Sequence, residues 1–275
     1  QLEDVPVAEG RLASTAITVA NTIYLFGGYS VAEDGTEVST PETLAFDPIT
    51  EEWTRRADMP TPVDDAVAFA YQDRYIYLVS GWHDDGNVSA VQVYDTQEDA
   101  WFRATDYPGA LVFGHSGGMV DGKIVIADGV AVTGMVDGKR QFSLIDEAWI
   151  GSIDLDDPSE IRWAEIVPHP GAPLYRMAVM GDAERGQIIF AGGGDNAYNI
   201  TGVGYDGVDT KPSDRIFAWD VTAYSWVELG RMPSPSMDHR GLIKSGEIYY
   251  IIGGLDAGLN VRAEITSFKL EQDQQ

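Results

Sequence analysis

The sequence predicts an all-β protein built from five consecutive copies of one repeat. Three regularities carry this prediction. The first is an apolar strand that ends in a glycine doublet, and the second is another apolar strand that ends in a polar residue. The third is a tryptophan followed at a fixed distance by a proline. Self-similarity at a period of about 50 residues indicates an architecture in which each repeat is one supersecondary unit.

The first regularity marks one apolar strand in each repeat. It ends in a doublet that always keeps at least one glycine: Gly27-Gly28, Ser80-Gly81, Asp128-Gly129, Gly192-Gly193 and Gly253-Gly254. Successive doublets are 53, 48, 64 and 61 residues apart. A glycine lets neighbouring strands approach closely. The two doublets that begin with Ser80 and Asp128 therefore keep the physical role of the motif.

The second and third regularities add two further strands to each repeat. The apolar strand that follows the doublet is expected at residues 43–47, 91–95, 149–154, 216–220 and 265–269. Trp53, Trp101 and Trp226 lie six residues after the Asp that ends this strand, and Trp163 lies nine residues after it. A proline follows each tryptophan by seven residues, at Pro60, Pro108, Pro170 and Pro233. Agreement of independent spacings over four copies is a strong signal.

A glycine doublet, a Tyr-Asp-like pair such as Tyr94-Asp95 and a tryptophan six residues later resemble the kelch repeat. The resemblance covers nearly the whole chain. It implies a β-propeller with one four-stranded blade per repeat. The number of doublets predicts five blades in a single domain that spans residues 1–275, and six blades are the alternative.

The two ends of the chain predict how the propeller closes. The fifth repeat stops after residues 267–269 without a tryptophan strand, whereas Pro6 occupies the position of Pro60 and Pro233. Residues 1–5 are therefore expected to form the end of an outer strand that pairs with the fifth blade and removes both sheet edges. The tryptophan expected before Gln1 predicts a natural chain that extends further upstream.

Composition excludes several function classes. The 275 residues carry 44 Asp and Glu against 18 Lys and Arg, a formal charge of −26. Nucleic acids and anionic membranes need basic patches, so neither is an expected partner. The chain contains no cysteine, which excludes thiolate metal sites and cysteine nucleophiles. No apolar run reaches transmembrane length. The sequence starts at Gln1 without a signal peptide, so we expect a processed N-terminus and a secreted or periplasmic protein.

Candidate site residues follow from the propeller topology. The segments after each proline and after each doublet should converge on one mouth, where loops on a rigid scaffold usually carry function. Four titratable residues there are candidates for proton transfer: His239, His115, Asp238 and Asp65. Packing or hydrogen bonding between blades is the alternative role for each. His169 lies in the connection that leads into blade four and is not a site candidate; it is expected to be solvated.

A second set of mouth residues suits ligand binding. Arg176, Arg240 and Arg11 offer planar guanidinium forks for a carboxylate or for sugar hydroxyls. The kelch resemblance makes bonding between neighbouring blades the alternative role of Arg176 and Arg11. The blade-four loop contributes amide, carboxylate and aromatic groups, and the blade-two loop contributes a Trp-His pair. These candidates are Tyr175, Asp195, Asn196, Tyr198, Asn199, Trp82 and His83. Long insertions after the doublets of blades three and four, the first with an Asp137-Gly138 hairpin turn, predict a partial lid.

Three functions remain open because fold does not determine function. The chain is similar to bacterial kelch propellers such as sialic acid mutarotases, which implies recognition of a sugar or sugar acid, or a non-redox isomerase. A lyase or hydrolase acting on a polysaccharide would use the same residue types, with Arg neutralising a uronate. A non-catalytic protein-interaction scaffold is the third alternative. The radical cofactor of galactose oxidase needs a Tyr–Cys crosslink, which a chain without cysteine cannot form.

The expected ligand is therefore a small sugar or a polysaccharide, bound by a monomer. No cofactor and no metal ion are expected: the four histidines are dispersed, and the carboxylates show no EF-hand-like spacing. The run Gly192–Asn199 resembles a phosphate loop superficially but lacks its Lys-Ser/Thr ending and the following helix. Hydroxyl recognition is the better interpretation of its Asp, Asn and Tyr side chains.

Overall fold

A computed structural model describes residues 3–84 and 86–270. Every regular element in this part of the chain is a β-strand, and none is a helix. Accordingly, no helix in the described residues is long and apolar enough to cross a membrane. The described residues pack as two compact units. Unit 1 runs to Phe113 and includes Gly151–Trp163, and unit 2 comprises Gly114–Ile150 and the residues from Ala164 onward.

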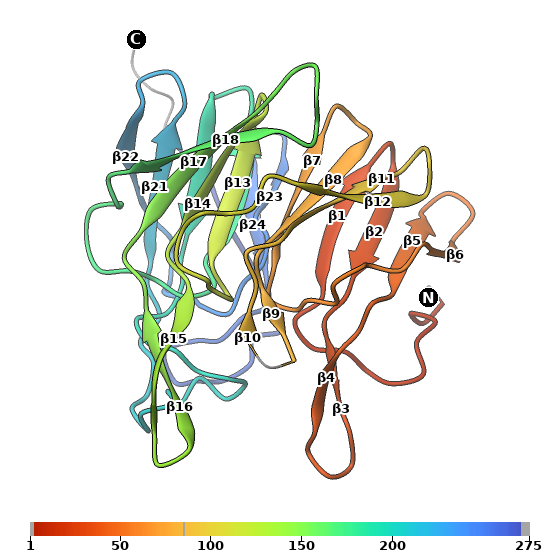
Figure 1. Cartoon of the computed structure of the whole chain (residues 1–275). Coiled ribbons are helices and arrows are strands. Elements are labelled where there is room, and N and C mark those ends of the chain that lie inside the picture. Colours follow the sequence, from red (N-terminus) through yellow and green to blue (C-terminus); the bar gives the residue numbers. More distant parts are fainter. Residues whose placement is uncertain (1–2, 85, 271–275) are drawn as a thin grey trace. The chain divides into compact units, whose positions relative to one another are not determined.

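Blades one and two lie in unit 1 and are four-stranded antiparallel sheets (Figure 1). Blade one has the order β1-β2-β5-β6, with β1 Thr15–Val19, β2 Thr22–Phe26, β5 Thr43–Asp47 and β6 Glu52–Arg56. Blade two has the order β12-β11-β8-β7, with β7 Val67–Tyr71, β8 Tyr75–Val79, β11 Val91–Asp95 and β12 Ala100–Ala104.

Blades three and four repeat this pattern. Blade three has the order β13-β14-β17-β18, with β13 Ser116–Val120, β14 Lys123–Ala127, β17 Ala148–Ile153 and β18 Ile161–Ile166. Blade four has the order β19-β20-β21-β22, with β19 Ala178–Asp182, β20 Gln187–Ala191, β21 Arg215–Asp220 and β22 Ser225–Arg231.

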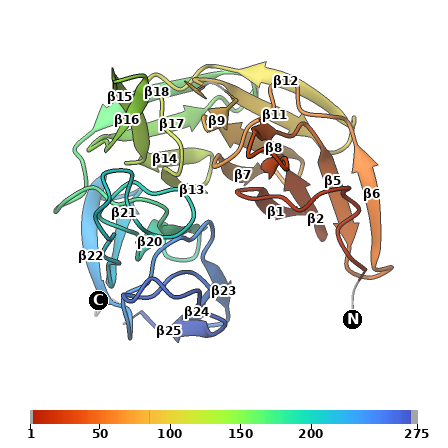
Figure 2. The same cartoon turned by 90° about the horizontal axis from the view of Figure 1, so that it is seen from below.

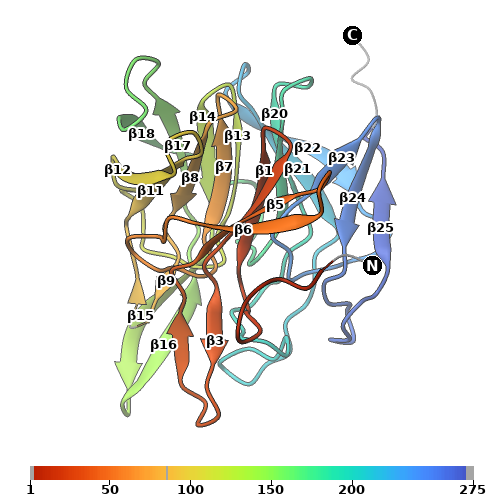
Figure 3. The same ribbon diagram turned by 90° about the vertical axis from the view of Figure 1, so that its right-hand side faces the viewer.

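Three two-stranded hairpins follow the doublets of the first three blades and extend beyond the ends of their sheets; all three are seen in Figure 1, and Figure 3 shows β3 and the β15–β16 pair from the side. They are β3 Tyr29–Val31 with β4 Glu37–Ser39, β9 Trp82–His83 with β10 Gly86–Asn87, and β15 Val130–Val136 with β16 Lys139–Leu144. In the last hairpin, Asp137 and Gly138 have φ values of +49° and +74°. Positive φ at both central residues is typical of the tight turn predicted there.

Strands next to the doublets are buried on both faces in blades two and four. Every residue of β20 is buried, as is every residue of β11. Because both faces are covered, these strands are mainly apolar and do not alternate strictly between apolar and polar residues. The outer strand is held by aromatic pairs, since Phe46, Tyr94 and Trp219 stand directly opposite Trp53, Trp101 and Trp226. This pairing explains the fixed Asp-to-Trp spacing of the sequence.

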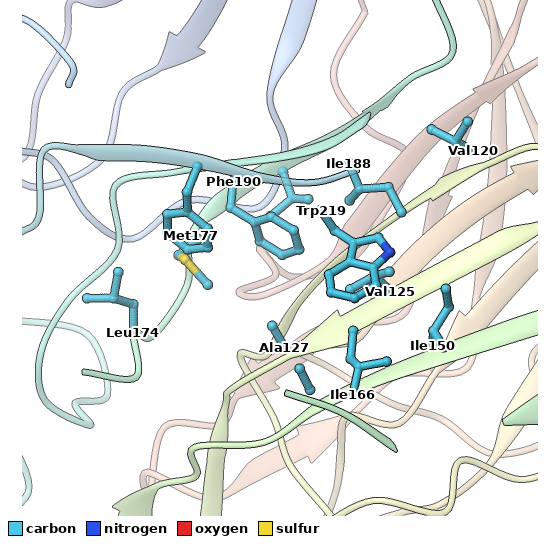
Figure 4. Packing of buried hydrophobic residues seen from close by; sticks show 13 residues of the cluster. Val120, Val125, Ala127, Ile150, Ile166, Leu174, Met177, Ile188, Phe190 and Trp219 are labelled. Atoms are coloured by element: carbon cyan, nitrogen blue, oxygen red, sulfur yellow. The ribbon is translucent and has the colours of Figure 1, made fainter. Parts of the chain in front are cut away.

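The apolar core lies between successive sheets. Figure 4 shows one cluster of unit 2, in which Val125 and Ala127 of β14 pack with Ile188 and Phe190 of β20 and with Trp219 of β21. Burying an aliphatic side chain of this size stabilises the fold by about 1.5–3 kcal/mol. The blades are therefore held together mainly by contacts between neighbouring sheets.

The doublets also link neighbouring blades through hydrogen bonds. The second glycine donates its N–H to a carbonyl of the next blade, as from Gly81 to Val112 (3.2 Å) and from Gly193 to Ser236 (3.0 Å). Ser80, which replaces the first glycine, adds a hydroxyl bond to Val112 O at 2.9 Å. Ser80 has a φ of +56°, in the left-handed region that favours glycine. The side-chain bond thus compensates for an unfavourable backbone conformation.

The fifth blade differs from the prediction. It has three strands in the order β23-β24-β25, with β23 Ile243–Ser245, β24 Ile248–Ile252 and β25 Ile265–Phe268 (Figure 2). Residues 3–5 form no strand, and Gln1 and Leu2 lie outside the described residues. Val7 donates its N–H to Val5 O, and this local turn replaces the extended conformation that strand pairing requires. Residues 3–5 are all exposed, so no buried face favours a strand there.

The predicted fold class is otherwise confirmed. The chain is an all-β propeller fold with five kelch-type blades, and the strands after each doublet fall within two residues of the expected positions. The assignment of residues 1–275 to a single domain stays a prediction.

Candidate functional site

The segment before the first strand of every blade contains one residue in the left-handed conformation. These residues are Ala13, Asp65, Gly114, Arg176 and Asp238, with φ values between +50° and +65°. The same conformation in all five blades shows that it is a feature of the repeat and does not mark a site in one blade. At Gly114 the requirement is steric as well, because a Cβ atom would lie 2.0 Å from a ring carbon of Tyr175.

Hydrogen bonds connect these segments from one blade to the next. The N–H of Asp65 donates to Ala13 O at 3.1 Å in unit 1. In unit 2, the N–H of Arg176 donates to Gly114 O, and the N–H of His239 donates to Arg176 O, both at 3.0 Å. In blades one, two, four and five this segment also pairs with the loop after the doublet of its own blade, as Tyr175 does with Gly194. The predicted convergence of these two kinds of segment is therefore present within these four blades.

Arg176 lies at the centre of a cluster in unit 2. Its guanidinium carbon is 4.5 Å from the ring centre of Tyr175 and 5.3 Å from that of Tyr198. Both tyrosines are fully buried, with ring centres 5.1 Å apart in an edge-to-face arrangement. Burial raises the pKa of Tyr198. Fully buried rings present no face to a ligand, so the geometry does not support direct ligand binding by the rings of these two candidates.

The guanidinium of Arg176 is bonded to protein groups. Its Nη1 donates to Asn199 O at 2.9 Å and to Asp238 Oδ1 at 3.0 Å. The side chain is 6% exposed. Arg176 therefore fastens the blade-four loop to the entry of blade five, which corresponds to the inter-blade role considered from the sequence. Asn199 contributes its backbone carbonyl to this contact.

The side chains of Asp238 and Arg240 lie together, whereas that of His239 lies apart from them. Asp238 Oδ1 lies 3.6 Å from Arg240 Nη1, and the two side chains are 28% and 33% exposed. His239 instead is buried, with its Nε2 3.0 Å from Ser236 Oγ. Burial lowers the pKa of His239 to about 4, more than the charge of Asp238 raises it. His239 is therefore neutral at pH 7.

The blade-four loop is ordered by its own polar side chains. Asp195 Oδ1 accepts the N–H of Lys211 at 2.7 Å, and Asn196 Nδ2 donates to Asp206 Oδ1 at 2.9 Å. Tyr205 stacks on Phe142 of β16, with ring centres 4.3 Å apart. This contact joins the two long insertions in which the lid was predicted. Asp195 and Asn196 thus have structural roles as well as candidate binding roles.

The other candidates occupy separate positions. His115 is buried in unit 2. In unit 1, Asp65 is buried, and Arg11 forms an ion pair with Glu42 at 2.9 Å. Burial lowers the pKa of Arg11 despite this partner. Trp82 and His83 form β9.

Trp82 and His83 contact other loops of unit 1. The indole N–H of Trp82 donates to Asp84 O at 3.1 Å, and its ring packs edge-on against Phe113. The Nδ1 of His83 lies 2.7 Å from Pro62 O. Pairing of β9 with β10 places both residues in the hairpin that follows the blade-two doublet.

Sequence reasoning missed a buried pair in unit 2. His169, which was expected to be solvated, is 2% exposed, and its Nε2 lies 2.8 Å from Asp128 Oδ2. The same carboxylate oxygen accepts the N–H of Leu174 at 2.7 Å. Asp128 thus links blade three to the entry of blade four. The signal in the sequence was the Asp that replaces the first glycine of a doublet.

The two pKa shifts of this pair have distinct causes. Burial raises the pKa of Asp128, against the lowering effect of the hydrogen bond from His169. Burial alone would lower the pKa of His169, but the hydrogen bond and charge of Asp128 outweigh it and raise that pKa. In the described residues, no group of three or more His, Asp or Glu side chains could hold a metal ion.

Comparison with known proteins finds relatives that share the kelch repeat. A family model described as the Kelch motif matches residues 10–60. The Kelch-like protein terF of Aspergillus terreus is 23% identical over 279 residues, which cover 97% of this chain and 55% of that protein. Kelch-like protein 15 of Gallus gallus is 28% identical over 136 residues, which cover 50% of this chain and 27% of that protein. The chain thus spans about half or less of the length of these relatives.

The solved structure of YjhT has the same fold. It superposes with a TM-score of 0.78 over 99% of this chain and 85% of that chain, at 15% sequence identity. Identity at this level carries the fold alone. The match extends over all the blades described above, whereas the family model covers only the first.

Proposed function

Because the chain belongs to the kelch-repeat β-propeller family, we propose that it is a ligand-binding propeller that recognises a sugar or sugar acid. The observation that carries the proposal is the Asp238–Arg240 pair at the entry of blade five. Its side chains are about one-third exposed and stand 3.6 Å apart, while Arg176 holds Asp238 from the protein side at 3.0 Å. A fixed carboxylate beside a reachable guanidinium suits hydroxyl groups together with a carboxylate.

Arg240 is the residue we assign to the ligand carboxylate. Arg176 is almost fully buried and already bonded to Asp238 and Asn199, so its charge is compensated within the protein. Arg240 bonds through Nη1 to the carbonyl of His239 and is more exposed. Asp238 would accept hydrogen bonds from hydroxyls, and Asp195 and Asn196 of the blade-four loop would extend the polar surface.

The proposal is recognition without proton transfer through His239. A general acid or base works best when its pKa lies near the working pH. The pKa of His239 is lowered to about 4 by burial, and its Nε2 faces Ser236. An anomer-exchange or lyase reaction at this site would therefore depend on Asp238 as the accessible titratable group.

A thermal-shift panel tests this function. The panel contains N-acetylneuraminic acid, glucuronate, galacturonate, glucose and galactose, each measured with the unmodified chain and with Arg240→Ala. A ligand at 100 times its Kd stabilises the folded state by about 2.7 kcal/mol. We expect the acidic sugars to raise the melting temperature of the unmodified chain and to lose this effect in Arg240→Ala.

The matched control is Arg162→Ala in β18, because Arg162 is an exposed arginine that also pairs with an aspartate, Asp154, at 2.7 Å. Arg162→Ala should keep the full response to acidic sugars. The proposal fails if no sugar shifts the melting temperature, or if Arg240→Ala responds as the unmodified chain does.

A protein-interaction role is the second candidate, favoured by one observation. The tip of the β15–β16 hairpin and the blade-four loop expose large apolar side chains in unit 2, listed here: Met135, Val136, Ile200, Tyr205 and Val208. Contiguous exposed apolar residues often mark protein-binding surfaces. A response to no sugar in the panel would favour this candidate.

A further inference from the structure

The β15–β16 hairpin is an insertion whose strands belong to no blade. β14 and β17 are neighbours in the sheet of blade three, although residues 128–147 lie between them in the chain. The hairpin forms a separate two-stranded sheet that extends beyond β14 (Figure 1). Blade three therefore does not need an unbroken hairpin to keep its four strands paired.

The outer part of this hairpin is exposed throughout. Residues 132–141 form the longest run of consecutive exposed residues in the described part of the chain. The turn at Asp137 and Gly138 lies in the middle of this run. Exposed loop tips of this kind are the preferred sites of proteolytic cleavage in folded proteins.

The tip can also open without disturbing the rest of the protein. The register of the hairpin shifts between Val132 and Gly134, and three cross-strand pairs follow, from Gly134–Gln141 to Val136–Lys139. A Cβ atom at Gly134 would meet nothing within 4 Å, so the strand is not packed at this position. A two-stranded hairpin is marginally stable by itself in water, and a glycine within it lowers its stability further. The residues beyond the shift should therefore open at a small cost in free energy.

The base of the hairpin is held in place. Val130 and Ala131 are buried at the start of β15. Phe142 of β16 stacks on Tyr205 of the blade-four loop, with ring centres 4.3 Å apart. Opening is therefore limited to the tip, while the packed base keeps both strands next to blade three.

The tip carries one of the two adjacent pairs of basic residues in the sequence. These two pairs are Lys139–Arg140 and Arg55–Arg56. Lys139 and Arg140 are both exposed and directly follow the hairpin turn. A protease that selects basic side chains can therefore reach them once the tip opens.

The second basic pair lies in a different environment. Arg55 and Arg56 belong to β6, where they stand opposite Leu44 and Thr43 in a continuous ladder. Arg55 also forms an ion pair with Asp58 at 2.9 Å. Cleavage at this pair would first require β6 to leave a four-stranded sheet. The two pairs thus have similar chemistry but differ in how much structure must open.

We propose that the β15–β16 tip is a proteolytic processing site, cut after Arg140 by a serine endoprotease that recognises paired basic residues, and that the two fragments stay folded together. A carboxylate in the specificity pocket of such an enzyme binds the arginine side chain. Water adds across the Arg140–Gln141 peptide bond, so the C–N bond breaks, Arg140 gains a carboxylate and Gln141 gains an amino group. Nothing is oxidised or reduced. The proposal is independent of sugar recognition.

The two fragments should stay together because each compact unit contains parts of both. Unit 1 includes Gly151–Trp163 of the second fragment, and unit 2 includes residues 114–140 of the first. In unit 2, Val125 of the first fragment shares a buried apolar cluster with Ile150 and Phe190 of the second. Separation of the fragments would expose this core to water, which is unfavourable.

Limited proteolysis of the folded full chain tests the proposal. The protease is a purified subtilisin-like endoprotease that cleaves after Lys-Arg and Arg-Arg pairs, and mass spectrometry identifies the bonds cut. Two synthetic peptides, with the sequences of residues 51–60 and 135–144, correct the rates for sequence preference. Corrected cleavage after Arg140 should be at least about 100-fold faster than after Arg56, because the rate follows the population of the open state.

Two variants and a size measurement complete the test. Lys139→Gln combined with Arg140→Gln should slow cleavage of the tip at least about tenfold, because the specificity pocket loses its cation. The matched control, Arg55→Gln combined with Arg56→Gln, should be cut after Arg140 as the unmodified chain is. Melting temperatures establish that both variants fold; if the control does not fold, the two rates in the unmodified chain decide alone. In gel filtration, fragments 1–140 and 141–275 should elute together at the position of the uncut chain.

Three results would overturn the proposal. One is a chain that stays uncut at a protease concentration that cleaves the 135–144 peptide completely. Another is corrected cleavage after Arg56 that is as fast as cleavage after Arg140. The third is separation of the two fragments in gel filtration under native conditions.

Discussion

At the scale of single residues, buried polar side chains join one blade to the next. Asp128 stands where the repeat calls for glycine and uses its carboxylate to hold His169 and the N–H of Leu174. Arg176 similarly joins the blade-four loop to Asp238. Removing one member of a buried charged pair is costly, because the other remains desolvated without compensation.

His169→Ala should therefore destabilise the chain by about 3–5 kcal/mol. The pKa of His169 is raised in the folded state, so its stabilising contribution is complete below the unfolded value of about 6.5 and is lost as pH rises through the folded pKa. Urea unfolding at pH 6 and pH 9 should show lower stability at pH 9, and His169→Ala should reduce this difference. His83→Ala, a half-exposed histidine, is the control and should cost at most about 1 kcal/mol. An unchanged pH dependence in His169→Ala would contradict the assignment.

At the scale of the element, each blade is built from local hairpins with their own turn chemistry. Asp220 Oδ1 accepts the N–H groups of Thr222 and Ala223 at 2.9 and 2.7 Å, between β21 and β22. Burial alone would raise the pKa of Asp220, but these backbone bonds outweigh it and lower that pKa. The turn brings Trp226 directly opposite Trp219. A side chain at a turn thus sets the register of the outer strand.

Asp220→Ala should lower the free energy of unfolding by about 1–3 kcal/mol, because two N–H groups lose a charged acceptor. Chemical denaturation with tryptophan fluorescence measures this loss and reports on Trp226 at the same time. Asp209→Ala changes an exposed aspartate of the blade-four loop and should stay within about 0.5 kcal/mol of the unmodified chain. Equal stability of the two variants would show that the turn bonds contribute nothing.

At the scale of the whole molecule, net charge is the dominant property. The chain carries −26 on 275 residues, with 28 Asp, 16 Glu, 13 Arg and 5 Lys. Repulsion among these carboxylates opposes the compact state and acts over a distance that salt shortens, from about 30 Å at 0.01 M to about 3 Å at 1 M. Each exposed ion pair contributes little against this background.

Raising NaCl from about 0.01 M to about 1 M should therefore increase the melting temperature at pH 7, because screening weakens the repulsion. Calorimetry or circular dichroism can follow the change. At about pH 4, where many carboxylates are protonated, the increase should be smaller. A melting temperature that falls with salt at pH 7 would indicate that favourable ion pairs outweigh the repulsion.

The sequence by itself determined the blades, because they depend on contacts between residues close together along the chain. Doublets, Asp-to-Trp spacing and prolines report hairpins and cross-strand pairs, so the strands after each doublet were predicted to within two residues. These features depend on residues close together in the sequence, so sequence patterns alone can predict them.

The tertiary structure alone decided which polar groups are buried and what they bond. His169 and Asp128 are 41 residues apart, and no spacing rule brings them together. Tyr198 and Asp238 meet Arg176 only after blades four and five pack against each other. Desolvation depends on all neighbouring sheets at once, so it emerges only when the blades are assembled.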